Sequence, residues 1–519
     1  MGMANWHGAR VFAGLLVAGS LFGIQSAVAG RANDTVTIAE ILPLGGTDVY
    51  FGSFPHTQFM SGMLFDTLVE YDPASKTIVP VLAKSWKENG DTSIDFELRD
   101  DVKWHDGKPF TADDVIYTIN WLTNPESKYN NKFRWAWIKG AEKIGPNTVR
   151  MLTNGRRPYD LLNLTQTPMY PAHIRGAMAD VTEFGRKPVG TGPYKLVEYS
   201  DAQGRLVVAK NPDYKWGGVA KPVTNIGRFV MRSIPDAGAQ VSGLMVGQID
   251  LFRGLPADQA EALAKDPRFA LDTNPNIGLT YMWFDAAGRA GNKALTNPKV
   301  REALALSVDR PQLEKIMNGN QKMPIPENMC WKDRVIACAF TKTQPGYDPA
   351  KAKKLLAEAG YPDGFNVRIT SYVGRLTQLA EAVAGFYAAI GVKATIEPVT
   401  VTTYTKKAQA GEIQMTVAGN SLSGLPDVSQ TFAFFYEATD YSGDPKMIEL
   451  GKAMGAEMDP EKRLAISQQF FDRMADNTYI TPLTALPHLF THTRELEAHT
   501  DSPSSYGITY SDIRWKDKK

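Results

Sequence analysis

The sequence is poor in cysteine and has no excess of either charge. Only Cys330 and Cys338 are cysteines among its 519 residues, and 57 basic residues balance 56 acidic ones. This balance gives the chain no general attraction to nucleic acid or to an anionic membrane surface. With no histidine or further cysteine nearby, the two cysteines make a poor metal site. The length exceeds what one hydrophobic core usually supports, which predicts at least two lobes.

Signatures of catalysis are also missing. The sequence has no HExxH, CxxC or GxSxG motif, and no phosphate-binding loop that ends in GKS or GKT. His488 and His492 have a spacing that would place them on one face of a helix, but Pro482 and Pro487 oppose a long helix there. We expect a solvated or packed pair, with metal binding as the weaker alternative. The sequence therefore predicts no catalytic residue, no metal and no cofactor.

Long hydrophobic runs are absent except near the N-terminus. Arg10 precedes the apolar residues 11–24, and small residues follow at 26–30. A basic start, a short apolar core and an Ala-x-Ala end are typical of a secretory signal peptide and predict cleavage after Ala29. The alternative is an uncleaved anchor, but the apolar core is shorter than the roughly 20 residues that a membrane span needs. We expect an exported, periplasmic protein that is monomeric.

The predicted export to an oxidising compartment favours a disulfide between the two cysteines. Disulfides persist in exported proteins. Cys330 and Cys338 enclose a short loop. We expect them to be bonded, with a stabilisation of about 2–3 kcal/mol from loop entropy.

The remaining pattern is a mixture of strands and capped helices in two halves. Asn89-Gly90 predicts a tight hairpin turn within residues 78–99, and residues 111–114 predict a capping box at the start of a helix. Prolines predict further helix starts at 298, 349 and 460, and residues 376–390 predict another helix. Strands at 365–370 and 392–401 lie between these helices. The fold class predicted is α/β.

Several short motifs occur in order along most of the chain. They are residues 82–86 (LAKSW), 96–99 (FELR), 102–107 (VKWHDG), 110–115 (FTADDV), 188–194 (PVGTGPY), 211–214 (NPDY), 216–218 (WGG), 247–250 (GQID), 297–304 (NPKVREAL), 308–310 (VDR), 347–349 (YDP) and 355–361 (LLAEAGY). Together they resemble the peptide/nickel class of ABC-transporter solute-binding proteins, the family of dipeptide- and oligopeptide-binding proteins. The motifs themselves have the character of turns and caps, so they indicate the fold rather than the ligand.

The resemblance implies a two-lobed periplasmic-binding-protein fold, type II-like, with an extra subdomain in the first lobe. The expected boundaries are 1–29 for the signal peptide, 30–285 for the first lobe with its subdomain at about 75–185, 286–489 for the second lobe, and 490–519 for a return to the first. The lobes of such a protein close over a ligand at their interface. The implied partners are a small ligand and the permease and ATPase of an ABC importer in the inner membrane.

Loop residues near the expected cleft are the candidate ligand contacts. Aromatic side chains offer large contact areas, and an arginine is suited to a ligand carboxylate. The alternative for each aromatic residue is packing within a lobe. The candidates are Asp48, Tyr50 and Trp135 from the first lobe, and Tyr372, Arg375, Asn420 and Asp427 from the second.

One feature of the family is missing from the corresponding segment. Peptide-binding members hold the α-amine of the ligand with an aspartate in a segment that matches residues 419–427, where the position falls near Gly424. A buried ammonium without a partner is unfavourable. The segment instead offers neutral polar groups such as Asn420, which suit an opine-like or sugar conjugate, although Asp427 remains an alternative amine partner.

The sequence thus predicts a non-catalytic receptor that captures a peptide, or a peptide-like or sugar-conjugate ligand, for import. Two alternatives remain: an exported peptide-binding sensor or chaperone that is not coupled to import, and an exported hydrolase, which the lack of a nucleophile–base signature opposes.

Overall fold

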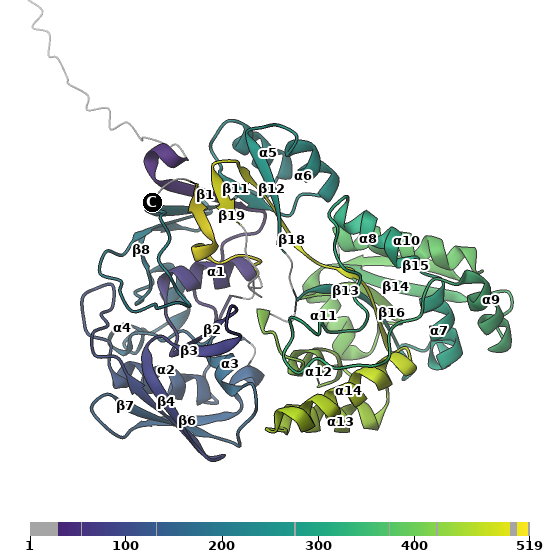
Figure 1. The fold of residues 1–519 in the computed structure, drawn as a ribbon, viewed down its shortest axis with the longest axis horizontal. Helices are drawn as coiled ribbons and strands as arrows, with labels where there is room; N and C mark the ends of the chain where they lie inside the picture. Colours follow the sequence, from purple (N-terminus) through teal and green to yellow (C-terminus); the bar gives the residue numbers. More distant parts are fainter. Residues whose placement is uncertain are drawn as a thin grey trace, which may run out of the picture.

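The chain folds into two lobes in the computed structural model (Figure 1). The structure describes residues 30–516, except for 53, 131, 275–276, 373, 422–423, 438 and 499–505. The expected signal peptide, residues 1–29, lies outside these residues. Within the described part of the chain, no helix is long and apolar enough to span a bilayer.

The first lobe is built on a seven-stranded mixed sheet with the order β12-β18-β11-β1-β10-β9-β8. Its strands are β1 (Thr35–Glu40), β8 (Tyr194–Ser200), β9 (Arg205–Lys210), β10 (Arg228–Ser233), β11 (Leu251–Arg253), β12 (Phe269–Asn274) and β18 (His488–Thr493). All six residues of β1 are buried, and β1 runs parallel to both of its neighbours. This is typical of a strand that is covered on both faces. The helices of this lobe are α1 (Pro55–Leu64), α3 (Asp160–Leu164), α4 (Ala172–Arg175), α5 (Ala237–Met245) and α6 (Ala257–Leu263), and a short ribbon pairs β19 (Leu496–Ala498) with β20 (Ile513–Trp515).

A subdomain extends the first lobe. Its four-stranded sheet has the order β4 (Ala83–Asn89), β5 (Ser93–Leu98), β7 (Thr148–Thr153) and β6 (Ile138–Lys143). The hairpin predicted at Asn89-Gly90 is confirmed, since β4 and β5 pair on either side of it. The predicted capping box is also confirmed, because Thr111 and Asp114 cap α2 (Ala112–Thr123) reciprocally. A second hairpin, β2 (Val69–Asp72) with β3 (Thr77–Pro80), connects the subdomain to α1.

The second lobe is a five-stranded sheet covered by helices (Figure 1). The sheet order is β15 (Lys393–Val399), β14 (Asn366–Tyr372), β16 (Met415–Asn420), β13 (Leu279–Phe284) and β17 (Ile480–Ala485). The helices are α7 (Pro298–Leu306), α8 (Arg310–Asn318), α9 (Pro349–Glu358), α10 (Arg375–Ala389), α11 (Val401–Ala410), α12 (Ser429–Phe432), α13 (Pro445–Ala456) and α14 (Pro460–Asp476). The helix starts predicted at 298, 349 and 460 are confirmed: a preceding Asn or Asp side chain caps each one.

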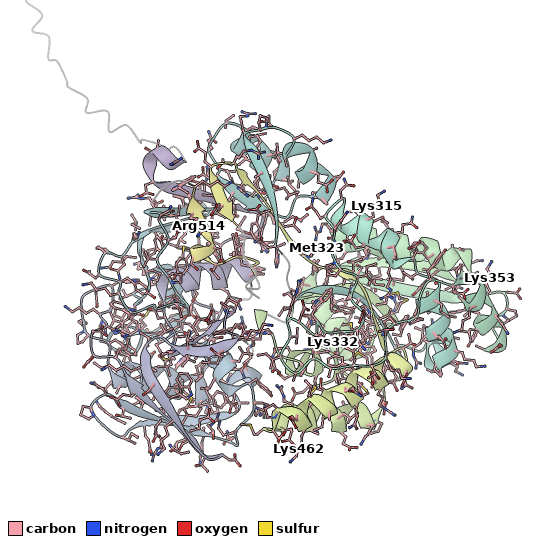
Figure 2. All side chains as sticks on the ribbon, in the orientation of Figure 1. Lys315, Met323, Lys332, Lys353, Lys462 and Arg514 are labelled. Carbon is pink, nitrogen blue, oxygen red and sulfur yellow. A yellow bond between two sulfur atoms is a disulfide. The ribbon has the colours of Figure 1, made fainter. Side chains whose placement is uncertain are left out.

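The division between the lobes differs from the expected one at residue 285. β13, expected in the first lobe, pairs with β16 and β17 in the sheet of the second lobe. The chain therefore crosses to the second lobe between β12 and β13, and returns between β17 and β18. Each lobe has its own buried core. Met323 and Lys332 lie on the side of the second lobe that faces the first (Figure 2).

Several of the sequence motifs meet at one buried ion pair in the first lobe. Lys221 Nζ lies 2.7 Å from Asp66 Oδ1 and also donates to the carbonyl oxygen of Phe65. The remaining acceptor positions of Asp66 are filled by the three side chains of Thr191, Tyr214 and Trp216. Burial acts to raise the pKa of Asp66, but the Lys221 ammonium and these donors outweigh it and the pKa is lowered. The motifs at 188–194 and 211–218 thus serve the packing of the first lobe.

Among the described residues, hydrogen bonds also link the lobes away from their cores. On one side, Glu261 of α6 accepts hydrogen bonds from Asn320 and Gln321 in the second lobe. On the other, Lys76, in the turn between β2 and β3, donates to the carbonyl oxygen of Asp333 at 3.1 Å. These exposed contacts bridge two separately packed bodies.

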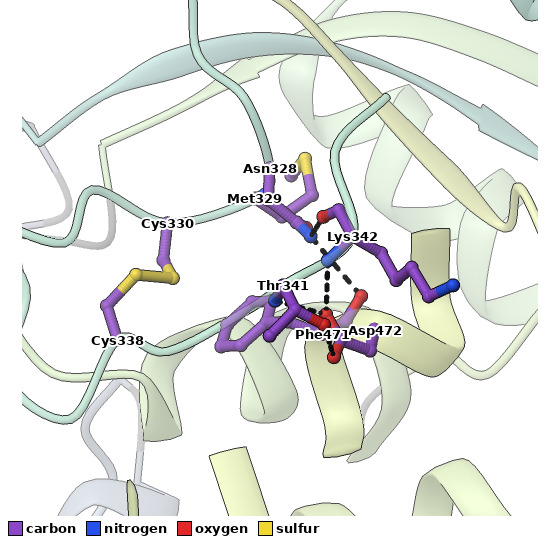
Figure 3. Close-up of a disulfide and its surroundings, with 8 residues drawn as sticks. All are labelled: Asn328, Met329, Cys330, Cys338, Thr341, Lys342, Phe471 and Asp472. Carbon is purple, nitrogen blue, oxygen red and sulfur yellow. Dashed lines mark hydrogen bonds between the residues drawn. A yellow bond between two sulfur atoms is a disulfide. The ribbon is translucent and has the colours of Figure 1, made fainter. Parts of the chain in front are cut away.

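Asp333 belongs to a loop that is closed by a disulfide (Figure 3). Cys330 and Cys338 are bonded, with their Cα atoms 5.9 Å apart. The Asn328 side chain donates to the carbonyl oxygens of Lys342 and Phe471 next to the loop. The disulfide therefore closes the loop on itself, and a hydrogen bond from Asn328 attaches the adjoining segment to α14.

The disulfide is expected to stabilise the second lobe. Reduction should lower the free energy of unfolding by about 2–3 kcal/mol, because the unfolded chain regains the entropy of the open loop. Urea denaturation with and without reductant measures this. A variant with both Cys330→Ala and Cys338→Ala is the control and should not respond to reductant; equal stability of the oxidised and reduced wild-type protein would contradict the expectation.

Candidate functional site

The principal cavity lies where the two lobes face each other. It has a volume of about 540 Å³. Its first-lobe wall includes parts of α1 and β2 and residues 134–135, 162, 165–166, 168, 219–222 and 508–512, while residues 421 and 424–426 close it from the second lobe. A cavity of this size, lined by polar and apolar side chains in similar proportion, is suited to a small organic ligand with polar groups.

Two side chains of the first-lobe wall are held by hydrogen bonds within that lobe. Trp135, a predicted contact, lines the cavity and is held by a hydrogen bond from its indole N–H to Thr167 Oγ1 at 2.9 Å. The neighbouring Arg134 donates to Gln166 Oε1 at 2.8 Å, and burial lowers its pKa. These bonds fix the wall before a ligand arrives, so less conformational entropy is lost on binding.

Charged groups on the cavity wall are mostly tied to other side chains. Lys221 pairs with Asp66, as described above. Asp72 accepts from the hydroxyl of Ser75, and Asp512 accepts from the hydroxyl of Thr509 in a capping box.

Glu70 on β2 differs from these groups. It is partly buried, and its only hydrogen bond within the described residues is the one it accepts from the Tyr71 N–H at 3.2 Å. Burial raises the pKa of Glu70 to about 7, against the lowering effects of the Lys221 ammonium and the Tyr71 N–H. Near neutral pH this carboxyl is therefore close to half-protonated in the ligand-free protein.

Two of the predicted contacts, Asp48 and Tyr50, lie beneath the wall rather than on it. Asp48 accepts from the Tyr170 hydroxyl at 2.8 Å and from the Tyr50 N–H at 2.9 Å, and Arg175 lies 3.6 Å away. The Tyr50 hydroxyl donates to the carbonyl oxygen of Pro168. Burial raises the pKa of Asp48 despite the Arg175 charge. Both side chains thus take part in the packing of the first lobe.

Asp427 also has a partner inside its own lobe. Its carboxylate forms two hydrogen bonds with the guanidinium of Arg463, at 2.8 and 2.7 Å, and caps the backbone N–H of Ser429. Both charged side chains are almost fully buried. Asp427 thus has a structural partner and caps local backbone, and its role as an alternative amine partner stays a prediction.

The other three residues predicted in the second lobe lie at or just after the carboxyl-terminal ends of the neighbouring parallel strands β14 and β16. Tyr372 ends β14, Arg375 begins α10 and Asn420 ends β16 just before Ser421, which lines the cavity. The Tyr372 ring contacts the Tyr404 ring, with centroids 4.6 Å apart. Burial lowers the pKa of Arg375, and no carboxylate of the described residues forms an ion pair with it.

The predicted pair His488 and His492 lies on strand β18 and not on a helix. His492 contacts the Asp272 carboxylate at 3.1 Å. Burial lowers the pKa of His488 to about 3. Among the described residues, no group of three or more His, Cys, Asp or Glu side chains is arranged to hold a metal ion.

Sequence reasoning missed Arg134 and Glu70. Arg134 lies beside the predicted Trp135, so extending the prediction to its neighbours would have found it. Glu70 carried no signal, because residues 69–72 (VEYD) read as an ordinary strand.

Comparison with known proteins places this two-lobed chain, with its cavity between the lobes, in the class of extracytoplasmic solute-binding proteins. Residues 77–443 match the family described as bacterial extracellular solute-binding proteins, family 5 Middle. The chain belongs to this family, whose members act as periplasmic receptors of ABC importers.

Curated relatives and solved structures give the same result. The chain is 30% identical to heme-binding protein A of Haemophilus influenzae over 71% of this chain and 70% of that protein. It is 28% identical to the dipeptide-binding protein of Escherichia coli, over 79% and 80% of the two chains. The fold matches a periplasmic binding protein of Helicobacter pylori in complex with the peptide STSA, with a TM-score of 0.77, 22% identity and coverage of 93% and 98%.

The buried pair in the second lobe generates a prediction. Asp427→Asn should lower the free energy of unfolding by about 3–5 kcal/mol, because it leaves the Arg463 charge buried without its partner. Urea denaturation checks this. Adding Arg463→Met to the variant removes the unpaired charge and should restore part of the stability; a stable Asp427→Asn protein that has lost only ligand affinity would contradict the structural role.

Proposed function

We propose that the chain captures a peptide or peptide-like solute in the cavity between its lobes and delivers it to the permease and ATPase of an ABC importer. The observation that carries the proposal is the cavity itself, which has walls from both lobes. A ligand that contacts both lobes stabilises the closed arrangement relative to the open one, which gives the transporter a signal that the receptor is loaded.

Trp135, Tyr372, Arg375 and Asn420 remain the proposed contacts among the predicted residues. Trp135 forms part of the first-lobe wall. Arg375 has no acidic partner among the described residues, which suits the carboxylate of a ligand. We propose that the signal peptide is cleaved after Ala29 and that the mature protein acts in the periplasm.

The ligand class is supported by the relatives and by the cavity. The names of the related proteins include dipeptide-binding and heme-binding proteins, so the family accepts chemically different cargo. The second-lobe residues that line the cavity, Ser421, Gly424, Leu425 and Pro426, carry no charge. This favours an opine-like or sugar conjugate as the second candidate class.

Gly62 provides the sharpest test of the cavity. It lies on α1 and lines the cavity, and a Cβ atom placed there would have no neighbour within 4 Å. Gly62→Trp should fill the cavity without disturbing the core and lower ligand affinity by about 100-fold or more. Gly62→Ala is the matched control and should bind normally, with stability higher by about 0.5–1 kcal/mol because alanine favours the helix.

The measurement is mass spectrometry of small molecules released from gently purified wild-type and variant proteins. We expect one ligand class in the wild-type protein and in Gly62→Ala, and none in Gly62→Trp. Thermal denaturation with the identified compound should raise the melting temperature of the first two only. Retention of the same compound by Gly62→Trp would place the binding site elsewhere. Cells that lack the protein should no longer take up that compound. An uptake assay on such cells therefore tests whether the protein serves an importer.

A further inference from the structure

One carboxyl on the cavity wall stands apart from the other charged groups there. Of the five charged side chains that line the cavity, four are bonded to other side chains, and Glu70 is the one without a side-chain partner in the described part of the chain. An unpaired, partly buried carboxylate is unfavourable, and proteins generally neutralise or pair such a group.

The groups around Glu70 do not supply the missing charge. Asp66 and Lys221 act on it electrostatically, but these two are paired with each other at 2.7 Å. The other titratable groups that face it are Tyr214 and Tyr510, whose pKa values burial raises well above 10, so both are neutral. Ionised Glu70 therefore has no cation bonded to it in the described part of the chain, and Lys221 acts on it only from within its pair with Asp66.

The opposite wall does not supply it either. The second-lobe residues that close the cavity are Ser421, Gly424, Leu425 and Pro426, and none of them is charged. The contents of the cavity are therefore a source from which a cationic partner for Glu70 can come.

We propose that Glu70 binds the ammonium group of the ligand and makes the cavity selective for solutes with a free amine. The inference rests on the proposed function, because it assigns one chemical group of the same ligand. Recognition of the charge falls to the first lobe, while the second lobe contributes neutral contacts.

Proton release is the expected signature of this contact. The carboxyl has a pKa of about 7 in the ligand-free protein, and an adjacent ammonium favours the ionised form. Affinity should therefore be highest above pH 7 and fall by up to tenfold for each pH unit below it. Titration calorimetry in buffers of different ionisation enthalpy should detect close to one proton released per ligand at pH 6.

The ligand-free protein should show the opposite dependence. The folded pKa of Glu70 lies above its ordinary value, so folding favours the protonated form. The stabilisation from Glu70 is present at low pH and is lost as pH rises through about 7. Glu70→Gln should therefore melt at a higher temperature than the wild-type protein at pH 8 and at nearly the same temperature at pH 5.

The decisive probes are a panel of dipeptides and glutathione with free amines, each beside its N-acetylated counterpart. Calorimetry should show that the wild-type protein binds members with free amines and not their acetylated forms. Glu70→Gln should weaken that binding roughly tenfold to hundredfold, since a charge-assisted hydrogen bond is lost. Glu97→Gln on β5, an exposed residue of the subdomain that bonds Thr148, is the matched control and should bind normally.

Each other outcome overturns the inference. Equal binding of acetylated probes, or unchanged binding by Glu70→Gln, would show that Glu70 does not recognise an amine while leaving the receptor function intact. Failure of every amine probe to bind would also reject the amine class. The receptor function would then be decided separately by the compound released from Gly62→Ala but not from Gly62→Trp.

Discussion

The buried pair of Asp66 and Lys221 is the interaction on which the first lobe depends. It joins the end of α1 to the glycine-rich turn at 188–194 and to the loop at 211–221. Gly190 and Gly192 approach the backbone of Leu64 so closely that a Cβ atom at either position would lie within 2.6 Å of it. A buried carboxylate that is satisfied by one ammonium and three neutral donors fixes these segments in one arrangement. α1, which ends here, forms part of the cavity wall.

This arrangement also explains why Asp66 has a cationic partner and the nearby Glu70 does not. Lys221 lines the cavity, but Asp66 and the Phe65 carbonyl oxygen hold it. The same ammonium cannot fully serve Glu70 as well. Asp66 is thus bonded within the framework of the first lobe, whereas Glu70 on β2 is the group that we propose to bind the ligand.

The sequence was a good guide where the signal is local. The proline starts of α7, α9 and α14, the capping box of α2 and the turn at Asn89-Gly90 depend on residues a few positions apart, and they were predicted correctly. The lobe boundary and the cavity depend on segments that are far apart in the sequence. β13 has a strand pattern that suits either sheet, and only its pairing with β16 and β17 assigns it to the second lobe. Likewise, Asp48 and Asp427 have carboxylates that could bind a ligand, but in the structure they accept hydrogen bonds from Tyr170 and Arg463 within their own lobes.

The position of β18 in the first sheet has a consequence for the order of folding. This strand lies between β12 and β11, although its residues come more than two hundred positions after theirs. During synthesis, β12 has no strand to pair with until nearly the whole chain has left the ribosome. The first lobe therefore cannot complete its sheet early, and the nascent chain stays in an unfinished state until its C-terminal part arrives.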